Sequence, residues 1–319
     1  MPFISSLESN FLAILQVFVL GCFGFYVMRR GILGQCCLRT ISNLVIDVTL
    51  PCFIFTNILD HFHAVHSHAW YLFPLYSVAM LGAAALVAAL YSRLDPSVRG
   101  SREFLAVVTY RNAGFLPLII VNALVAGPVA ERLFVYIFLF IIVFSPLLYS
   151  TSGRLFSTSG NQSLARNLLN PATITTAAAL GLALAHARFL IPDVLFIPVK
   201  MLGNSTIPLS MIVIGGIVMV NTTQRIRFPL GFVLRAALIS LVAFPLLVFF
   251  IVRALPLSPD VRFLLVLEAM MPPAVTLPLL ARRHNADFEL TGQALFGITV
   301  ISLITVPLLL TILDLVPGK

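Results

Sequence analysis

Charged residues are scarce in this sequence, and that scarcity excludes most classes of protein. Only 10% of the 319 residues are Asp, Glu, Lys or Arg, and 60% are hydrophobic. A soluble domain carries about 25% charged residues, so these values and a mean hydropathy of +1.04 exclude a soluble globule. The basic residues occur singly or in pairs, so the net charge of +8 does not indicate nucleic-acid binding. The composition predicts a polytopic membrane protein that has the lipid bilayer as its surroundings.

Cysteine is also rare, and the four residues show neither metal-ligand spacing nor a secreted disulfide pattern. They lie in or beside the first two hydrophobic runs, as Cys22, Cys36, Cys37 and Cys52. The sequence also lacks an HExxH motif, an isoprenoid-type acidic cluster and aspartates paired at protease spacing. We therefore expect neither an enzyme nor a bound metal or organic cofactor.

Four histidines fall within eight residues of one loop predicted to face outward. They are His61, His63, His66 and His68. Imidazoles at this density suit a metal site or a pH sensor. Only Asp60 stands beside them as a carboxylate, so a solvated loop is the favoured interpretation.

The hydrophobic runs predict ten transmembrane helices at about 20 apolar residues per span. They cover residues 10–28, 42–59, 69–91, 103–126, 130–151, 169–187, 196–220, 229–252, 261–281 and 290–314. Nothing basic precedes the first span and no small-residue cleavage site follows it, so we expect a retained helix. Arg and Lys are concentrated in the loops after odd-numbered spans. These loops are predicted to be cytoplasmic, with both termini on the other side of the cell (inner or plasma) membrane.

The second half of the sequence repeats the first at an offset between 157 and 161 residues. The matches pair residues 10–21 with 170–181, Leu116-Pro117 with Leu277-Pro278, residues 145–150 with 306–311, and Asp47-x-x-x-Pro51 with Asn204-x-x-x-Pro208. A near-constant offset over several spans indicates an internal repeat. We expect repeats at 1–151 and 169–319 and a cytoplasmic linker at 152–168. Because each repeat has five spans, the two copies must cross the bilayer in opposite senses.

The ninth predicted span contains residues that do not suit a regular helix in lipid. It carries Glu268, and Pro272, Pro273 and Pro278 remove the backbone donors that the carbonyls of Glu268, Ala269 and Ala274 would need. Unpaired carbonyls are tolerated at membrane depth only in protein or beside a wet cavity. The segment therefore predicts two half-helices that meet near the midplane.

The fourth span, the inverted partner of the ninth, is predicted to be broken as well. Arg111 and Asn112 occupy the repeat positions of Pro272 and Pro273, Gly114 weakens the helix and Pro117 frees a carbonyl. Two broken helices that cross would place four half-helix ends around one point. The amino-terminal ends favour an anion there, and the carboxy-terminal carbonyls favour a cation.

Three stretches resemble the auxin efflux carrier family, which includes plant PIN carriers and bacterial permeases. They are residues 271–307, a proline-broken helix with a basic loop and a last span, Asn112-x-Gly114, and residues 41–55. The resemblance implies an all-α fold of ten helices, as in PIN, sodium/proton antiporter and bile-acid transporter structures. Spans 1, 2, 6 and 7 would form a scaffold, and the other spans a moving transport domain with crossed helices 4 and 9. Family members move small carboxylate-bearing molecules. Arg111 departs from the proline of plant carriers, and Pro117 comes earlier than theirs.

The candidate site residues fall into three groups. Those predicted to bind substrate are Asn112, Arg111, Gly114, Pro272, Pro273 and Ala274. Those predicted to couple an ion are Glu268 and Asp47, supported by Asn204 and Asn43. Each has a structural alternative. Asn112 could cap a broken helix, Glu268 could pair with Arg111 or Arg235, and Asn204 could bond between helices.

These observations predict a secondary transporter that moves a small organic anion by elevator-type alternating access. The alternative is a sodium-coupled symporter of the bile-acid type with Glu268 as a cation ligand. Coupling to Na⁺ or H⁺ is open at this point, and a homodimer through the scaffold helices is expected. A channel is disfavoured because broken helices that close around one site suit occlusion.

Overall fold

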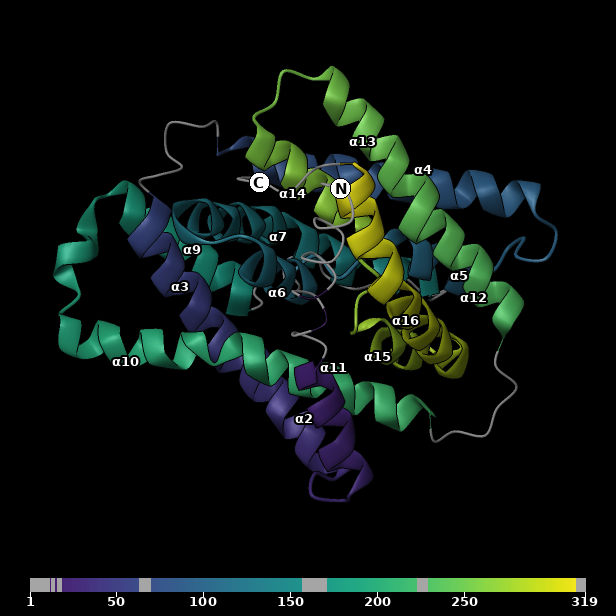
Figure 1. Ribbon diagram of the computed structural model, residues 1–319, viewed down its shortest axis with the longest axis horizontal. Coiled ribbons are helices and arrows are strands. Elements are labelled where there is room, and N and C mark those ends of the chain that lie inside the picture. The colour runs from purple at the N-terminus through teal and green to yellow at the C-terminus, as the bar shows by residue number, and fades with distance from the viewer. Residues whose placement is uncertain are drawn as a thin grey trace.

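The computed structural model describes residues 12, 15, 19–62, 70–156, 171–222 and 229–313, and these residues form helices without β-strands (Figure 1). Six helical segments are long and apolar enough to cross a membrane. They are Gln35–His61, Leu72–Leu94, Gly127–Phe156, Asp193–Gly216, Leu230–Ala254 and Phe288–Ile312. The chain is therefore a polytopic membrane protein.

Shorter elements and interruptions lie between and within these segments. In chain order the elements are α2 (Gln35–Leu44), η1 (Val45–Thr49), α3 (Leu50–His61), α4 (Leu72–Leu94), α5 (Arg102–Thr109), α6 (Phe115–Leu124), α7 (Gly127–Phe156), α9 (Pro171–Leu184), η3 (Ala187–Leu190), α10 (Asp193–Asn204), α11 (Thr206–Thr222), α12 (Leu230–Ala237), η4 (Leu238–Ala243), α13 (Phe244–Ala254), α14 (Pro259–Met270), α15 (Leu277–Arg283) and α16 (Phe288–Ile312). A further apolar helix, Val19–Arg29, precedes α2.

Two predicted span boundaries differ from the structure by five residues or more. The second span begins at Gln35 instead of residue 42, because the polar residues of α2 hide a helix that starts directly after Gly34. The fifth span continues to Phe156, so the first residues of the predicted linker are helical and residues 157–168 lie outside the described part. Three of the four loop histidines also lie outside it. His61 is described, and its Nδ1 atom lies 3.2 Å from Glu131 Oε2. Within the described residues no group of three or more potential metal ligands occurs.

The helices pack as two groups. In the first group, α3 packs against α9 and α10, and α2 packs against α11. In the second, α4 packs against α5 and α7, α13 against α14, and α15 against α16. Figure 1 shows α2, α3, α9 and α10 on the left and below, and α12, α13 and α16 on the right. Helix α7 belongs to the second group and also contacts α3 and α9, so it lies where the groups meet.

Both helix breaks predicted from the prolines and Gly114 are present. The fourth span consists of α5 and α6, and the ninth consists of α14 and α15. The residues between the half-helices are extended and pair antiparallel around Arg111 and Pro273. Asn112 N donates to Pro272 O at 2.8 Å, and Ala274 N donates to Tyr110 O at 2.9 Å. The two interrupted spans therefore cross and complete part of each other's backbone hydrogen bonding.

The amino-terminal helix and α11 approach so closely that only glycine fits between them. A Cβ atom at Gly215 would overlap the backbone carbonyl of Gly21, and one at Gly24 would overlap the carbonyl of Ile212. Small residues at such crossings let helix backbones pack directly against each other in a membrane. This contact fixes the amino-terminal helix to the first helix group.

We expect Gly215→Ala to destabilise the protein by about 1 to 3 kcal/mol, because the methyl group meets backbone that cannot move aside. Gly181→Ala in α9 is the matched control, since a Cβ atom there meets nothing within 4 Å. Thermal unfolding of the detergent-solubilised protein measures both. Equal midpoints for the two variants would contradict the close approach.

Candidate functional site

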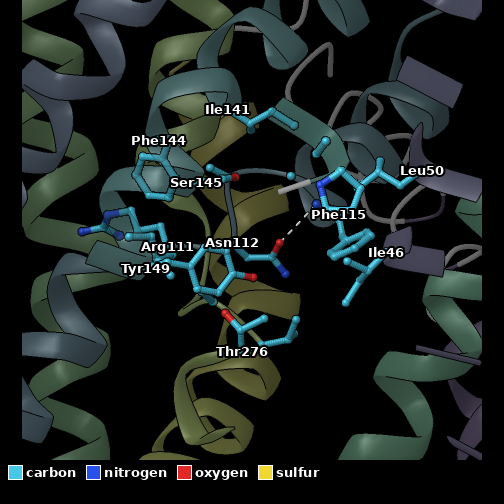
Figure 2. Close-up of a pocket in the computed structure, with 17 residues that line it drawn as sticks. Ile46, Leu50, Arg111, Asn112, Phe115, Ile141, Phe144, Ser145, Tyr149 and Thr276 are labelled. Carbon is cyan, nitrogen blue, oxygen red and sulfur yellow. Dashed lines mark hydrogen bonds between the residues drawn. The ribbon is translucent and has the colours of Figure 1, made fainter. Parts of the chain in front are cut away.

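A cavity of about 110 Å³ lies at the crossover, between the two helix groups. Figure 2 shows the side chains around it. The first group contributes residues of η1, α3 and α9, and the second contributes both crossover segments and α7. The lining residues are Ile46, Leu50, Arg111, Asn112, Ala113, Gly114, Phe115, Ile141, Phe144, Ser145, Leu148, Tyr149, Pro171, Ala172, Ala274, Val275 and Thr276. The cavity is thus mostly apolar, with a few polar side chains and none that is acidic.

Asn112 lies in the cavity wall and has two different amide atoms to place. Its Oδ1 atom accepts a hydrogen bond from the backbone N–H of Phe115 at 3.2 Å (Figure 2). This bond caps the first turn of α6, which has no side-chain cap at Gly114. The Nδ2 atom is buried and has no hydrogen-bond partner among the described residues. Both interpretations of Asn112 therefore fit one residue, because one amide atom caps the helix and the other is a donor left for a ligand.

Arg111 is buried, with 3% of its surface exposed, and its guanidinium group points toward backbone carbonyls. Its Nη1 atom donates to the carbonyl oxygens of Ser240, Ala269 and Met271 at 2.8, 2.9 and 3.3 Å. The guanidinium carbon lies 4.3 Å from the centre of the Phe244 ring, a distance that gives a cation–π interaction. Arg111 thus ties the fourth span to η4 and to the broken ninth span.

Glu268 does not line the cavity and is not ion-paired with Arg111. Its side chain is 1% exposed, and neither carboxylate oxygen has a hydrogen-bond partner within the described structure. Glu268 and Arg111 line a second, narrow gap that has no room for a water molecule. Arg235, the other partner considered from the sequence, pairs with Asp95 at 2.9 Å. The structural alternative for Glu268, an ion pair with Arg111 or Arg235, is therefore not formed, because carbonyls and Asp95 hold the two guanidinium groups.

The other residues predicted to bind substrate divide into two pairs. Gly114 and Ala274 line the cavity, whereas Pro272 and Pro273 do not. The prolines act through the backbone instead. The three backbone carbonyls that lose their helical donors to Pro272, Pro273 and Pro278 each accept a hydrogen bond from another group. Ala269 O accepts from Arg111. Glu268 O accepts from Met271 N at 3.4 Å, and Ala274 O accepts from Leu277 N at 3.0 Å.

Asp47, Asn43 and Asn204 do not line the cavity at the crossover. Asp47 is exposed within η1, Asn43 is exposed in α2, and Asn204 is the exposed last residue of α10. Element η1 contacts both α10 and α11, so the irregular parts of the second and seventh spans lie close together. Asp47 interacts electrostatically with Tyr149 of α7. Ion coupling by these residues stays a prediction.

Three hydroxyl residues of the cavity were not among the candidates from the sequence. Ser145 and Tyr149 are four residues apart on α7 and so lie on one face of that helix. The Tyr149 side chain interacts with Thr276, which precedes α15 (Figure 2). The repeat between residues 145–150 and 306–311 pointed to this part of α7, but hydroxyl residues also occur on structural faces of apolar helices.

Crossed, broken helices around a small cavity are typical of membrane transporters. Residues 10–167 and 160–310 match the model of the family described as membrane transport protein. Because these matches cover nearly the whole sequence, the chain belongs to this family, to which the auxin efflux carriers and PIN carriers belong. The family consists of transporters and not of enzymes. A comparison with curated proteins finds no match.

The two roles of Asn112 predict different stabilities for two substitutions. Asn112→Ala removes the cap of α6 and should cost about 0.5 to 2 kcal/mol. Asn112→Asp keeps an acceptor for Phe115 N beside the positive end of the half-helix, so it should lose less. Thermal unfolding in detergent compares the two variants. If Asn112→Asp were the less stable variant, Oδ1 would not be the cap.

Proposed function

We propose that the protein is a secondary transporter for a small organic anion that carries a carboxylate, bound in the cavity at the crossover. The observation that carries this proposal is the Nδ2 atom of Asn112, a buried donor without a partner in the cavity wall. A buried donor left without a hydrogen bond costs about 1 to 3 kcal/mol of free energy. A bound carboxylate would recover that cost.

The charges around the cavity favour an anion. Arg111 is the one charged side chain among the described residues that line the cavity. Its guanidinium group is directed at backbone carbonyls, and its charge adds positive potential nearby. The amino terminus of α6 begins at the cavity, with Gly114 as its cap residue. A helix amino terminus carries a partial positive charge. Asn112 supplies the hydrogen-bond donor, and the other two groups supply positive potential where a substrate carboxylate would lie.

The size and lining of the cavity favour a small substrate. Its volume of about 110 Å³ is below the roughly 300 Å³ at which drug-sized ligand sites begin. Ile46, Leu50, Phe144 and Leu148 supply apolar surface for the rest of the molecule. The hydroxyl groups of Ser145, Tyr149 and Thr276 surround it with further polar contacts.

The position of the cavity between the two helix groups supports alternating access. The first group would act as the scaffold and the second, with the crossover, as the moving domain of an elevator. This arrangement agrees with ten spans in two inverted repeats. We also propose that loops after odd-numbered spans face the cytoplasm of a cell (inner or plasma) membrane, with both termini outside and a homodimer through the first helix group.

Glu268 is the candidate coupling residue, with a proton as its ion. The gap that holds its carboxylate has no room for water, so it admits a proton more readily than a hydrated cation. An ionised carboxylate without a partner is costly in this setting, whereas its protonated form is neutral. Protonation of Glu268 would therefore accompany a step in which Arg111 or the substrate changes position.

Uptake of small carboxylates into proteoliposomes tests the substrate proposal. Flux should saturate and show counterflow. Asn112→Ala should weaken apparent affinity about ten- to hundredfold, because a hydrogen bond to a charged group contributes roughly 1.5 to 3 kcal/mol. Asn112→Asp should weaken it at least as much, since it keeps the cap but replaces the donor with a negative charge.

Asn122→Asp provides the matched control, because Asn122 is exposed on the same half-helix, α6. It should leave affinity unchanged. If Asn112→Asp bound the carboxylate as tightly as the wild type, Asn112 would be only a helix cap. Flux that fails to saturate would indicate a channel instead.

Glu268→Gln keeps the shape of the side chain and removes its titration. Accumulation driven by a proton gradient should disappear in this variant, while exchange of substrate for substrate continues. Parallel uptake and exchange assays with pH-jumped vesicles separate the two, with Glu289→Gln at the exposed start of α16 as the control. Gradient-driven accumulation by Glu268→Gln at the wild-type level would exclude Glu268 as the coupling group.

A further inference from the structure

We infer that the guanidinium group of Arg111 is a tethered cation in a site that would otherwise take a free alkali-metal ion. The site consists of the carbonyls of Ser240, Ala269 and Met271, with Glu268 as its nearby acidic side chain. The inference rests on the proposed function for its consequence, because a built-in cation can replace a coupling ion only in a carrier. The site itself stands on backbone geometry.

Two of the three carbonyls lack helical partners because of prolines. Ala269 O would pair with the nitrogen of Pro273, which carries no hydrogen. Ser240 lies in η4, a π-helical segment in which a carbonyl bonds to the amide five residues later. The backbone amides that could reach Ser240 O are therefore those of residues 244 and 245, and neither donates to it. Phe244 N bonds to Ile239 O, and residue 245 is proline. These two breaks, on different spans, direct their free carbonyls at the same point.

The convergence suits a cation better than a neutral donor. Nη1 has two hydrogens but faces three carbonyl oxygens, at 2.8, 2.9 and 3.3 Å. Ala269 and Met271 also lie at the carboxy-terminal end of α14, where the helix dipole is negative. Backbone carbonyls that surround one positive centre are the ligand type used for alkali ions in membrane proteins.

Glu268 is the acidic side chain beside this site, and its carboxylate would supply the negative charge to a free cation bound there. Its carboxylate is buried, lacks a hydrogen-bond partner and lines the same gap as Arg111. The gap has no room for water, so no space for an additional hydrated ion exists while the guanidinium is in place. The arginine therefore makes the wild-type carrier independent of sodium and potassium.

Removal of the arginine side chain should convert this site into one for a free ion. We would purify Arg111→Ala in detergent and measure its thermal unfolding in sodium, potassium or choline chloride at equal ionic strength. The midpoint should be lowest in choline and rise by several degrees, saturably, in at least one alkali cation. The wild-type midpoint should be the same in all three salts.

Two further variants make the result specific. Arg111→Lys should show no cation dependence, because an ammonium group on the same stem again supplies the charge. Arg111→Ala combined with Glu268→Gln should lose most of the stabilisation by alkali ions, since the acidic partner is neutral. Arg111→Gln serves in the same assay if Arg111→Ala does not fold, and it should show the same cation dependence.

Equal midpoints in all three salts for the folded neutral variant would overturn the inference. So would a wild-type midpoint that rises in sodium as much as that of the variant. The assay contains no organic substrate, so its outcome is separate from the transport proposal. Failure of every carboxylate to be taken up by the wild type would overturn only that proposal.

Discussion

The structure depends on one constraint, that backbone polar groups at membrane depth must find partners inside the protein. Prolines and Gly114 interrupt the fourth and ninth spans, and the exposed backbone is then satisfied by the crossing itself. Asn112 N bonds to Pro272 O, and Ala274 N bonds to Tyr110 O. Neither broken span could lie in the membrane in this conformation without the other. The two halves of the chain are therefore bonded to each other at the breaks in these two helices.

The polar side chains at the crossover follow from the same constraint. Arg111 satisfies carbonyls that prolines released, and Asn112 caps the half-helix that begins beside it. In a membrane protein with broken helices, such side chains are required to hydrogen-bond the free backbone groups, whether or not a ligand binds. The proposed function rests on two of the groups that have no partner in the described structure, the Nδ2 atom of Asn112 and the carboxylate of Glu268.

The sequence allowed both helix breaks and the crossover part of the cavity wall to be predicted, because proline and the repeat offset act through local backbone chemistry. Asn112, Arg111, Gly114 and Ala274 do line the cavity. The direction of the Arg111 side chain could not be predicted in the same way. The backbone partners of Arg111 include Ser240, which is 129 residues away in the sequence. Its carbonyl is free because η4 is π-helical, and Pro245 is the one sequence feature that indicates this irregularity. The pairing with Glu268, the structural alternative that charge suggested, is therefore not formed.

The hydrogen bonds of the Arg111 guanidinium group all lie on one side of the boundary between the two helix groups, and this arrangement bears on the proposed movement. Arg111 is fixed to carbonyls of η4 and of the ninth span, both within the second helix group. It therefore stabilises the interior of that group and makes no bond across the boundary with the first group. The residues that the first group presents to the cavity, such as Ile46 and Leu50, are apolar. Sliding along an apolar surface breaks no buried hydrogen bonds, so the polar crossover can stay intact while the two groups move relative to each other.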